Sequence, residues 1–207
     1  MEDFHLNTIN FDAMEVSLMH KHLSRTVTIT YDECLHLLSL SREIHLKRKE
    51  HLFLQGEIAK YVAFVQKGCL RYYFIDENGH DHIIYFAQEE WWIGDLNSFY
   101  QSEPTANNLQ ALEPTVLYAY DKSNFDKARA DIKAFDEYCK KRHAKATAAR
   151  MQEMMDKQSV PAEDRYQRLL TTFPDIFQRV PQHYIASYLG IKPESLSRIR
   201  KRLHDKK

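Results

Sequence analysis

The sequence is poor in the residues that mark secreted, metal-binding and membrane-spanning proteins. It holds three cysteines in 207 residues, and Cys34, Cys69 and Cys139 lie far apart, with no pair at the spacing of metal ligands. This pattern is typical of a reduced, cytoplasmic setting. No apolar run is long enough to cross a bilayer, and the first residues lack the basic and then apolar pattern of a signal peptide. We therefore expect a cytoplasmic protein with no membrane partner.

The chain also lacks a net charge, but its two ends differ. Lys and Arg together number 29, and so do Asp and Glu. Residues 160–207 carry ten basic and five acidic side chains, whereas residues 1–159 carry 19 and 24. A basic segment that follows an acidic one is typical of a DNA-binding module attached to a sensory or scaffolding domain. The length allows one large domain or two modest ones, each with a sufficient core.

Two apolar stripes with helical spacing occur near the C-terminus. Gly190 separates them, at a point where the chain must reverse and where a left-handed residue costs least. Pro193 suits the first turn of the second helix, because the missing N–H has no helical partner there. This pattern predicts a helix-turn-helix. Its inward residues are Ile185, Ala186 and Leu189 in the first helix and Leu196, Ile199 and Leu203 in the second.

The second helix of this pair would expose a polar and basic face. An Arg side chain can bind a guanine edge through two hydrogen bonds, and the remaining cations suit phosphates. A solvated face on an ordinary helix pair would show the same run of charge, and so would a face that docks on an acidic protein. The turn glycine, the small Ala186 and the basic face occur together, which favours double-stranded DNA as the partner.

The middle of the chain alternates between apolar and polar residues and is rich in β-branched and aromatic side chains. Thr30 and Glu33 form a capping-box pattern that starts a short helix before it. Asn78-Gly79 is typical of a hairpin turn. The pattern predicts short antiparallel strands closed as a small barrel or jelly roll. The expected strands include residues 61–65, 70–75, 82–86, 108–112 and 115–120.

After Asp121 the pattern becomes helical, with one long helix that Ser159-Val160-Pro161 ends as a hinge. A further helix is expected from Ala162 to Thr172. Within the long helix, four residues have the spacing of a two-helix coiled-coil seam, which predicts a homodimer; packing against the chain's own barrel would give the same spacing. The DNA-binding prediction favours the dimer, because one helix-turn-helix reads only a short half-site. The seam residues are Ala144, Ala148, Met151 and Met155.

In this order of elements the chain resembles the Crp/Fnr family of transcriptional regulators over nearly its full length. Gln55-Gly56-Glu57 and the segment from Tyr61 to Arg71 look like the first signature of the family's barrel. The resemblance implies an α+β protein in three parts. These are N-terminal helices with a cyclic-nucleotide-binding-like barrel (residues 1–121), a helical segment with the dimerisation helix (122–159), and a winged helix-turn-helix-like DNA-binding domain (160–207).

The ligand signature of the family is incomplete in this chain. In the family's cyclic-nucleotide binders, a Gly-Glu pair is followed about ten residues later by an Arg that pairs with the cyclic phosphate. Gly94-Asp95 matches the pair, but residues 102–107 contain no cation. We therefore expect no response to cyclic AMP. A different small-molecule effector would find its pocket among Trp91, Trp92, Gly94, Asp95, Phe99 and Thr105. No cofactor is expected, because only Cys34 precedes the barrel and an iron–sulfur cluster needs several cysteines.

The resemblance also assigns roles on the recognition helix. Glu194 and Arg198 match positions that read bases in the family, whereas Pro193 replaces an Arg, so we do not expect the family's usual half-site. RNA polymerase is a further partner that the resemblance implies. The residues expected at the DNA backbone are Lys192, Ser195, Ser197, Arg200, Lys201 and Arg202.

One enzyme class competes with this interpretation. Gly79-His80-Asp81-His82 and Glu89 resemble the metal motif of cupin-like enzymes, and two His with a carboxylate can hold iron or manganese. However, His80 directly follows Gly79 where that motif has a gap, and no matching later His occurs on a glycine-proline turn. We therefore expect a regulator without catalytic residues and without a metal.

Overall fold

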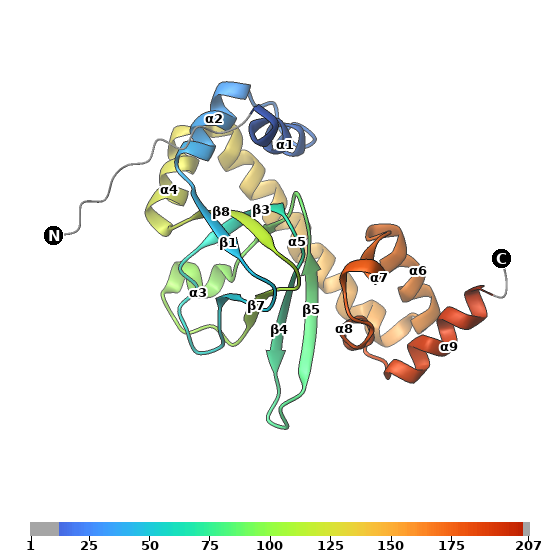
Figure 1. Cartoon of the computed structure of the whole chain (residues 1–207). Helices are drawn as coiled ribbons and strands as arrows, with labels where there is room; N and C mark the ends of the chain where they lie inside the picture. Colours follow the sequence, from blue (N-terminus) through green and yellow to red (C-terminus); the bar gives the residue numbers. More distant parts are fainter. Residues whose placement is uncertain (1–12, 205–207) are drawn as a thin grey trace.

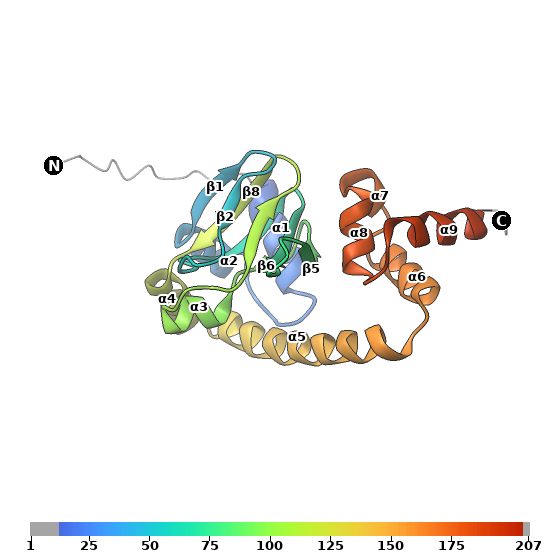
Figure 2. The ribbon, with the colours of Figure 1, turned by 90° about the horizontal axis from the view of Figure 1, so that it is seen from below.

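The computed structural model describes residues 13–204 and shows an α+β protein (Figure 1). A β-barrel with N-terminal helices and a unit of C-terminal helices lie side by side, and one long helix connects them (Figure 2). Residues 1–12 and 205–207 of the expected first and third parts lie outside the described residues. None of the described helices combines the length and the apolar character that crossing a membrane requires.

Two helices precede the barrel, α1 (Ala13–Leu23) and α2 (Tyr31–Ser39). The predicted capping box is confirmed at the start of α2. The Glu33 amide donates to Thr30 Oγ1 at 3.2 Å, and the Thr30 amide donates to Glu33 Oε2 at 2.8 Å. Both exposed amides at this helix start thus have partners, which fixes where α2 begins.

The barrel is a jelly roll of two four-stranded antiparallel sheets. Leu70, Leu109 and Leu117 are fully buried between them, which follows from the alternation of apolar residues. Strand β5 lies at the edge of the second sheet, so one side of its main chain is free to bind another element. In spatial order, the first sheet holds β1 (Arg42–Leu46), β8 (Thr115–Tyr120), β3 (Val62–Lys67) and β6 (Trp92–Ile93), and the second holds β2 (His51–Phe53), β7 (Asn108–Ala111), β4 (Leu70–Ile75) and β5 (Asp81–Ala87).

The hairpin between β4 and β5 extends from the barrel, as Figure 1 shows. Its turn is where the sequence predicts it. Gly79 has φ of 81°, and its amide donates to the Asp76 carbonyl at 2.9 Å. The turn thus needs the positive φ that glycine adopts without strain.

The helical segment after the barrel consists of two helices, α4 (Lys122–Asp131) and α5 (Lys133–Ser159), separated by the extended residue Ile132. Phe135 and Tyr138 anchor the start of α5 in the core beside Trp92. The rest of α5 reaches from the barrel to the C-terminal helices (Figure 2). Short helix α3 (Leu96–Gln101) connects β6 to β7 and buries Ser98 and Phe99.

The C-terminal unit contains α6 (Ala162–Thr172), α7 (Ile176–Arg179), α8 (Gln182–Tyr188) and α9 (Pro193–His204). The predicted bounds of α6 and the helix break after Ser159 are confirmed. The expected wing is wrong for the described residues, because 160–204 contain helices and no strand. Four helices and the short connections between them take up this segment, which leaves no stretch long enough for two paired strands.

Candidate nucleic-acid interface and sensor site

Helices α8 and α9 form the predicted helix-turn-helix. Gly190 lies between them with φ of 65°, and the Ile191 amide donates to the Ala186 carbonyl at 3.0 Å. The predicted inward residues pack as expected: Leu203 is half-buried, and the others are buried, namely Ile185, Ala186, Leu189, Leu196 and Ile199. The apolar stripes therefore determine which face of α9 remains outside.

Helix α9 lies on the side of the C-terminal unit away from the barrel, and its exposed residues form its outer face (Figure 2). Glu194 and Arg198 are exposed on it, and Arg198 donates to Ser195 Oγ at 3.1 Å. Within the part of the chain that the structure describes, no carboxylate pairs with Arg198 or Lys201. Their charges are thus available to a ligand. Of the expected backbone contacts, Lys192, Ser197, Lys201 and Arg202 are exposed, and Ser195 and Arg200 are half-buried.

Two of the cations of α9 are engaged by their own domain. Arg202 pairs with Glu163 of α6 at 2.6 Å. The guanidinium carbon of Arg200 lies 4.4 Å from the centroid of the Phe177 ring. To contact phosphates, Arg200 and Arg202 would have to leave these partners. We therefore expect each of them to contribute less to DNA affinity than Lys201 does.

Asp95, one of the residues expected in an effector pocket, lies at the centre of a hydrogen-bond network. The Asp95 Oδ2 atom accepts from Thr105 Oγ1 at 2.6 Å, from the Tyr72 hydroxyl at 2.9 Å and from Asn107 Nδ2 at 3.4 Å. Burial opposes ionisation of Asp95, but the hydrogen bonds from Thr105 and its neighbours outweigh it and hold the pKa below its ordinary value. The carboxylate is thus satisfied by the chain itself, and no cation takes part.

The glycine of this signature is required by close packing. A Cβ on Gly94 would lie 3.1 Å from the Tyr61 carbonyl oxygen, and its φ is 148°. The aromatic residues predicted for the same pocket diverge. Trp92 and Phe99 are buried in the core, whereas Trp91 is half-exposed and its ring centroid lies 5.5 Å from that of Phe173 in the C-terminal unit. Of the six expected residues, Trp91, Trp92 and Gly94 line one cavity, and Asp95, Phe99 and Thr105 do not line it.

The residues of the cupin-like alternative do not converge. His80 and His82 both lie beside Asp76 at the hairpin tip, with 2.8 Å between His82 Nε2 and Asp76 Oδ2. Glu89 binds Arg179 instead. Among residues 13–204, no three His, Cys, Asp or Glu side chains lie together as metal ligands would.

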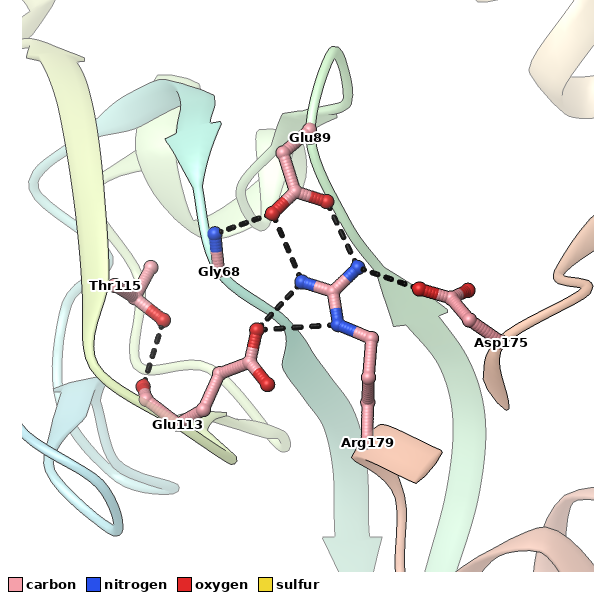
Figure 3. Close-up of polar contacts among 6 residues, drawn as sticks. All are labelled: Gly68, Glu89, Glu113, Thr115, Asp175 and Arg179. Atoms are coloured by element: carbon pink, nitrogen blue, oxygen red, sulfur yellow. Dashed lines mark hydrogen bonds and ion pairs between the residues drawn. The ribbon is translucent and has the colours of Figure 1, made fainter. Parts of the chain in front are cut away.

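Sequence reasoning missed an ion cluster that joins the C-terminal unit to the barrel (Figure 3). Arg179 of α7 donates to both oxygens of Glu89 at 2.8 Å and to Glu113 Oε1 at 2.5 Å. Asp175 adds a contact of 3.5 Å, and the Gly68 amide donates to Glu89 at 2.7 Å. The hydrogen bonds with Glu89 and Glu113 raise the pKa of Arg179. We call these residues the Arg179 cluster.

A second contact attaches α8 to the edge strand β5. Ser187 Oγ donates to the Asp81 carbonyl at 2.8 Å and accepts from the Ile83 amide at 3.1 Å. The buried Arg71 guanidinium lies between two rings, 3.7 Å from the Tyr73 centroid and 4.0 Å from that of Tyr184. Barrel and helix-turn-helix residues thus share one hydrophobic cluster.

Replacing Arg179 with Met should lower the free energy of unfolding by about 1–2 kcal/mol. Glu89 and Glu113 would lose their partner. Both side chains are about one third exposed, so hydration by water compensates for part of the lost interaction. Urea denaturation measures this effect. Lys127→Met, which removes an exposed surface pair on α4, is the matched control and should change stability by less than about 0.5 kcal/mol.

The same variant has a defined pH dependence. Burial opposes ionisation of Glu89, but hydrogen bonds from Arg179 and the Gly68 amide hold its pKa below the ordinary 4.5. A depressed carboxyl pKa stabilises the folded state above the ordinary value, and that stability is lost as pH falls through the folded pKa. The difference in the free energy of unfolding between the wild type and Arg179→Met should therefore become smaller below pH 4.5. A difference that widens in acid would refute this account.

Comparisons with known proteins agree with this architecture. Residues 43–131 match the model of the cyclic nucleotide-binding domain. No curated protein sequence matches the chain. Several solved structures share the fold across most of their length. FixK2 from Bradyrhizobium japonicum is 19% identical, with a TM-score of 0.65, over 80% of this chain and 85% of that one.

Two further solved structures, a regulator and an activator, share the same fold. CLP of Xanthomonas campestris, a c-di-GMP-responsive global regulator, is 14% identical, with a TM-score of 0.67, over 86% of this chain and 93% of that one. The Thermus thermophilus catabolite activator protein is 14% identical, with a TM-score of 0.55, over 89% and 87%. Residues 43–131 thus match the cyclic nucleotide-binding domain, and the chain as a whole shares the fold of solved regulators of the Crp/Fnr type.

Proposed function

We propose that the protein is a DNA-binding transcriptional regulator, with α9 as its recognition helix. The observation that carries this proposal is the outer face of α9, where Glu194, Arg198 and Lys201 are exposed while the apolar stripe of the same helix is buried. Glu194 and Arg198 read base edges, and Lys201 contacts phosphates together with Lys192, Ser195 and Ser197. No residue is assigned a catalytic role.

The regulator acts as a homodimer through α5. Ala144, Ala148, Met151 and Met155 are all exposed, and the side chains of Met151 and Met155 retain 64% and 55% of their accessible surface. The alternative that this stripe packs against the chain's own barrel is therefore wrong. A row of exposed apolar side chains at coiled-coil spacing suits the same row on a second copy. Two recognition helices then reach successive major grooves about 34 Å apart.

Cyclic AMP and cyclic GMP are not effectors of this regulator. Asp95 already accepts hydrogen bonds from Tyr72, Thr105 and Asn107, and residues 102–107 supply no cation for a cyclic phosphate. Isothermal titration of the full chain with either nucleotide should give no saturable heat. Binding with a micromolar dissociation constant would contradict the proposal.

Selection of duplexes from a random-sequence pool tests the DNA-binding function. The full chain should enrich one sequence pattern, and the enriched duplexes should dissociate steeply with salt, because phosphate contacts release counterions. A protein whose basic helix docks on an acidic partner would enrich no sequence.

A further inference from the structure

Three methionines gather in one short stretch of α5. Met151, Met154 and Met155 are half of the six methionines in the sequence. They keep 64%, 68% and 55% of their accessible surface, and they lie within about 100° of one another around the helix. Met19, by contrast, is fully buried in the core. We call Met151, Met154 and Met155 the exposed methionines.

The exposed methionines overlap with the seam expected between two copies of α5. Met151 and Met155 belong to this seam, and Met154 lies beside it, about 60° around the helix from Met151. Methionine side chains adapt their shape to a partner, which suits an interface. The other seam residues, Ala144 and Ala148, carry no side-chain donor. A polar group introduced into the seam would therefore find no side-chain hydrogen-bond donor among the seam residues.

The thiols of the chain react poorly with oxidants. Cys34 and Cys69 are buried, and Cys139 is half-buried. Burial raises the pKa of each of these thiols to about 12. A cysteine reacts as its thiolate, and very little thiolate is present at neutral pH with such pKa values. A thioether needs no deprotonation. Among the side chains that the structure describes, the exposed sulfur atoms thus belong to the exposed methionines.

Oxidation of a thioether by hydrogen peroxide makes the side chain polar. A lone pair of the sulfur attacks one oxygen of the peroxide, and the O–O bond breaks. The departing hydroxide takes up the proton of the transferred oxygen and leaves as water. The sulfur loses two electrons, the peroxide gains them, and the product is methionine sulfoxide. Burial of this polar oxygen in an apolar seam without a donor is unfavourable.

The sulfur atoms are accessible whenever the two chains separate. All three exposed methionines face solvent in the single chain, so each cycle of dissociation and reassociation presents them to the oxidant. An oxidised chain reassociates more weakly than a reduced one. Monomers therefore accumulate by mass action as oxidation proceeds.

We propose that hydrogen peroxide oxidises the exposed methionines and thereby converts the regulator to a monomer that binds its DNA site weakly, a step that rests on the proposed homodimer. A methionine sulfoxide reductase restores the thioethers and with them the dimer. The chain thus responds to an oxidant through thioethers on its dimer seam and not through thiols.

Sedimentation of the full-length protein before and after treatment with hydrogen peroxide tests this proposal. Peptide mass spectrometry should find sulfoxide at the exposed methionines before it appears at Met19, and the dissociation constant of the dimer should rise about tenfold or more. Dithiothreitol alone, which reduces disulfides and sulfenic acids, should not restore the dimer. Dithiothreitol together with methionine sulfoxide reductases for both sulfoxide epimers should restore it.

Two sets of substitutions separate the exposed methionines from the other oxidisable groups. Met151→Leu, Met154→Leu and Met155→Leu together remove the sulfur atoms and nearly keep the side-chain volume. Whatever the starting dissociation constant of this triple variant, peroxide should not change it. Met19→Leu is the matched control, because it removes a methionine that the core protects. This control should dissociate on treatment as the wild type does.

Three results would overturn the proposal. One is a dimer that persists although all three exposed methionines carry sulfoxide, and another is an equal loss of dimer in the triple leucine variant. The third is oxidation of Met19 at the same rate, because that would show that the chain unfolds during treatment. A chain that is monomeric before treatment would instead contradict the homodimer itself, and the untreated sample distinguishes this case from the other three.

Discussion

Replacing both Met151 and Met155 with Glu should convert the protein to a monomer and weaken its binding to a duplex with two half-sites on the order of 10²-fold or more. The double variant places like charges in the seam, where the partner's identical residues would face them. Both side chains are exposed in the single chain, so the fold of each protomer should not change. Sedimentation measures the oligomeric state, and fluorescence anisotropy measures the affinity.

The matched control carries the same two charges elsewhere. Leu35→Glu with Leu54→Glu also replaces exposed apolar side chains, 43% and 42% exposed, on α2 and after β2. This control should remain dimeric and keep its affinity for DNA. If the seam variant also remains dimeric, α5 is not the interface.

Arg198→Ala should reduce the free energy of binding to the selected duplex by about 1–3 kcal/mol and relax the preference for one base. Lys201→Ala should instead weaken binding to all sequences alike. The structure gives the reason for the contrast. Arg198 is exposed and is oriented by Ser195, near the start of the helix that would enter the groove. Lys201 is exposed three residues further along the same helix, where a flexible ammonium reaches a phosphate.

The comparison of the two variants needs the selected and a random duplex at the same salt concentration. Lys127→Ala, on α4, removes a cation away from α9 and should leave both affinities unchanged. An equal loss of affinity on both duplexes for Arg198→Ala would show that Arg198 contacts only the backbone.

Local patterns predicted the elements well. The alternation of apolar residues located β4, β5 and β8 within one residue, and helical spacing identified the buried side of α9. These predictions depend on neighbours along the chain, which the sequence shows directly. The expected wing was wrong because the resemblance implied strands in a segment that helices α6 to α9 occupy almost completely.

Contacts between distant segments could not be predicted in this way. Arg179 and Glu89 are 90 residues apart, and Ser187 and Ile83 are 104 apart, so no local pattern joins them. The surroundings of the expected effector residues show the same limit. Trp92 of strand β6 enters the core, whereas Asp95, three residues later, caps helix α3 and accepts hydrogen bonds from Tyr72 and Thr105.

Recognition of a DNA sequence by paired α9 helices can be measured by selecting duplexes from a random pool with the full-length protein. We expect an enriched motif with two-fold symmetry, whose half-site centres lie about 10 base pairs apart, and whose enrichment disappears in Met151→Glu with Met155→Glu. Recovery of no motif, or of a motif that the double variant enriches equally well, would show that paired α9 helices do not read DNA.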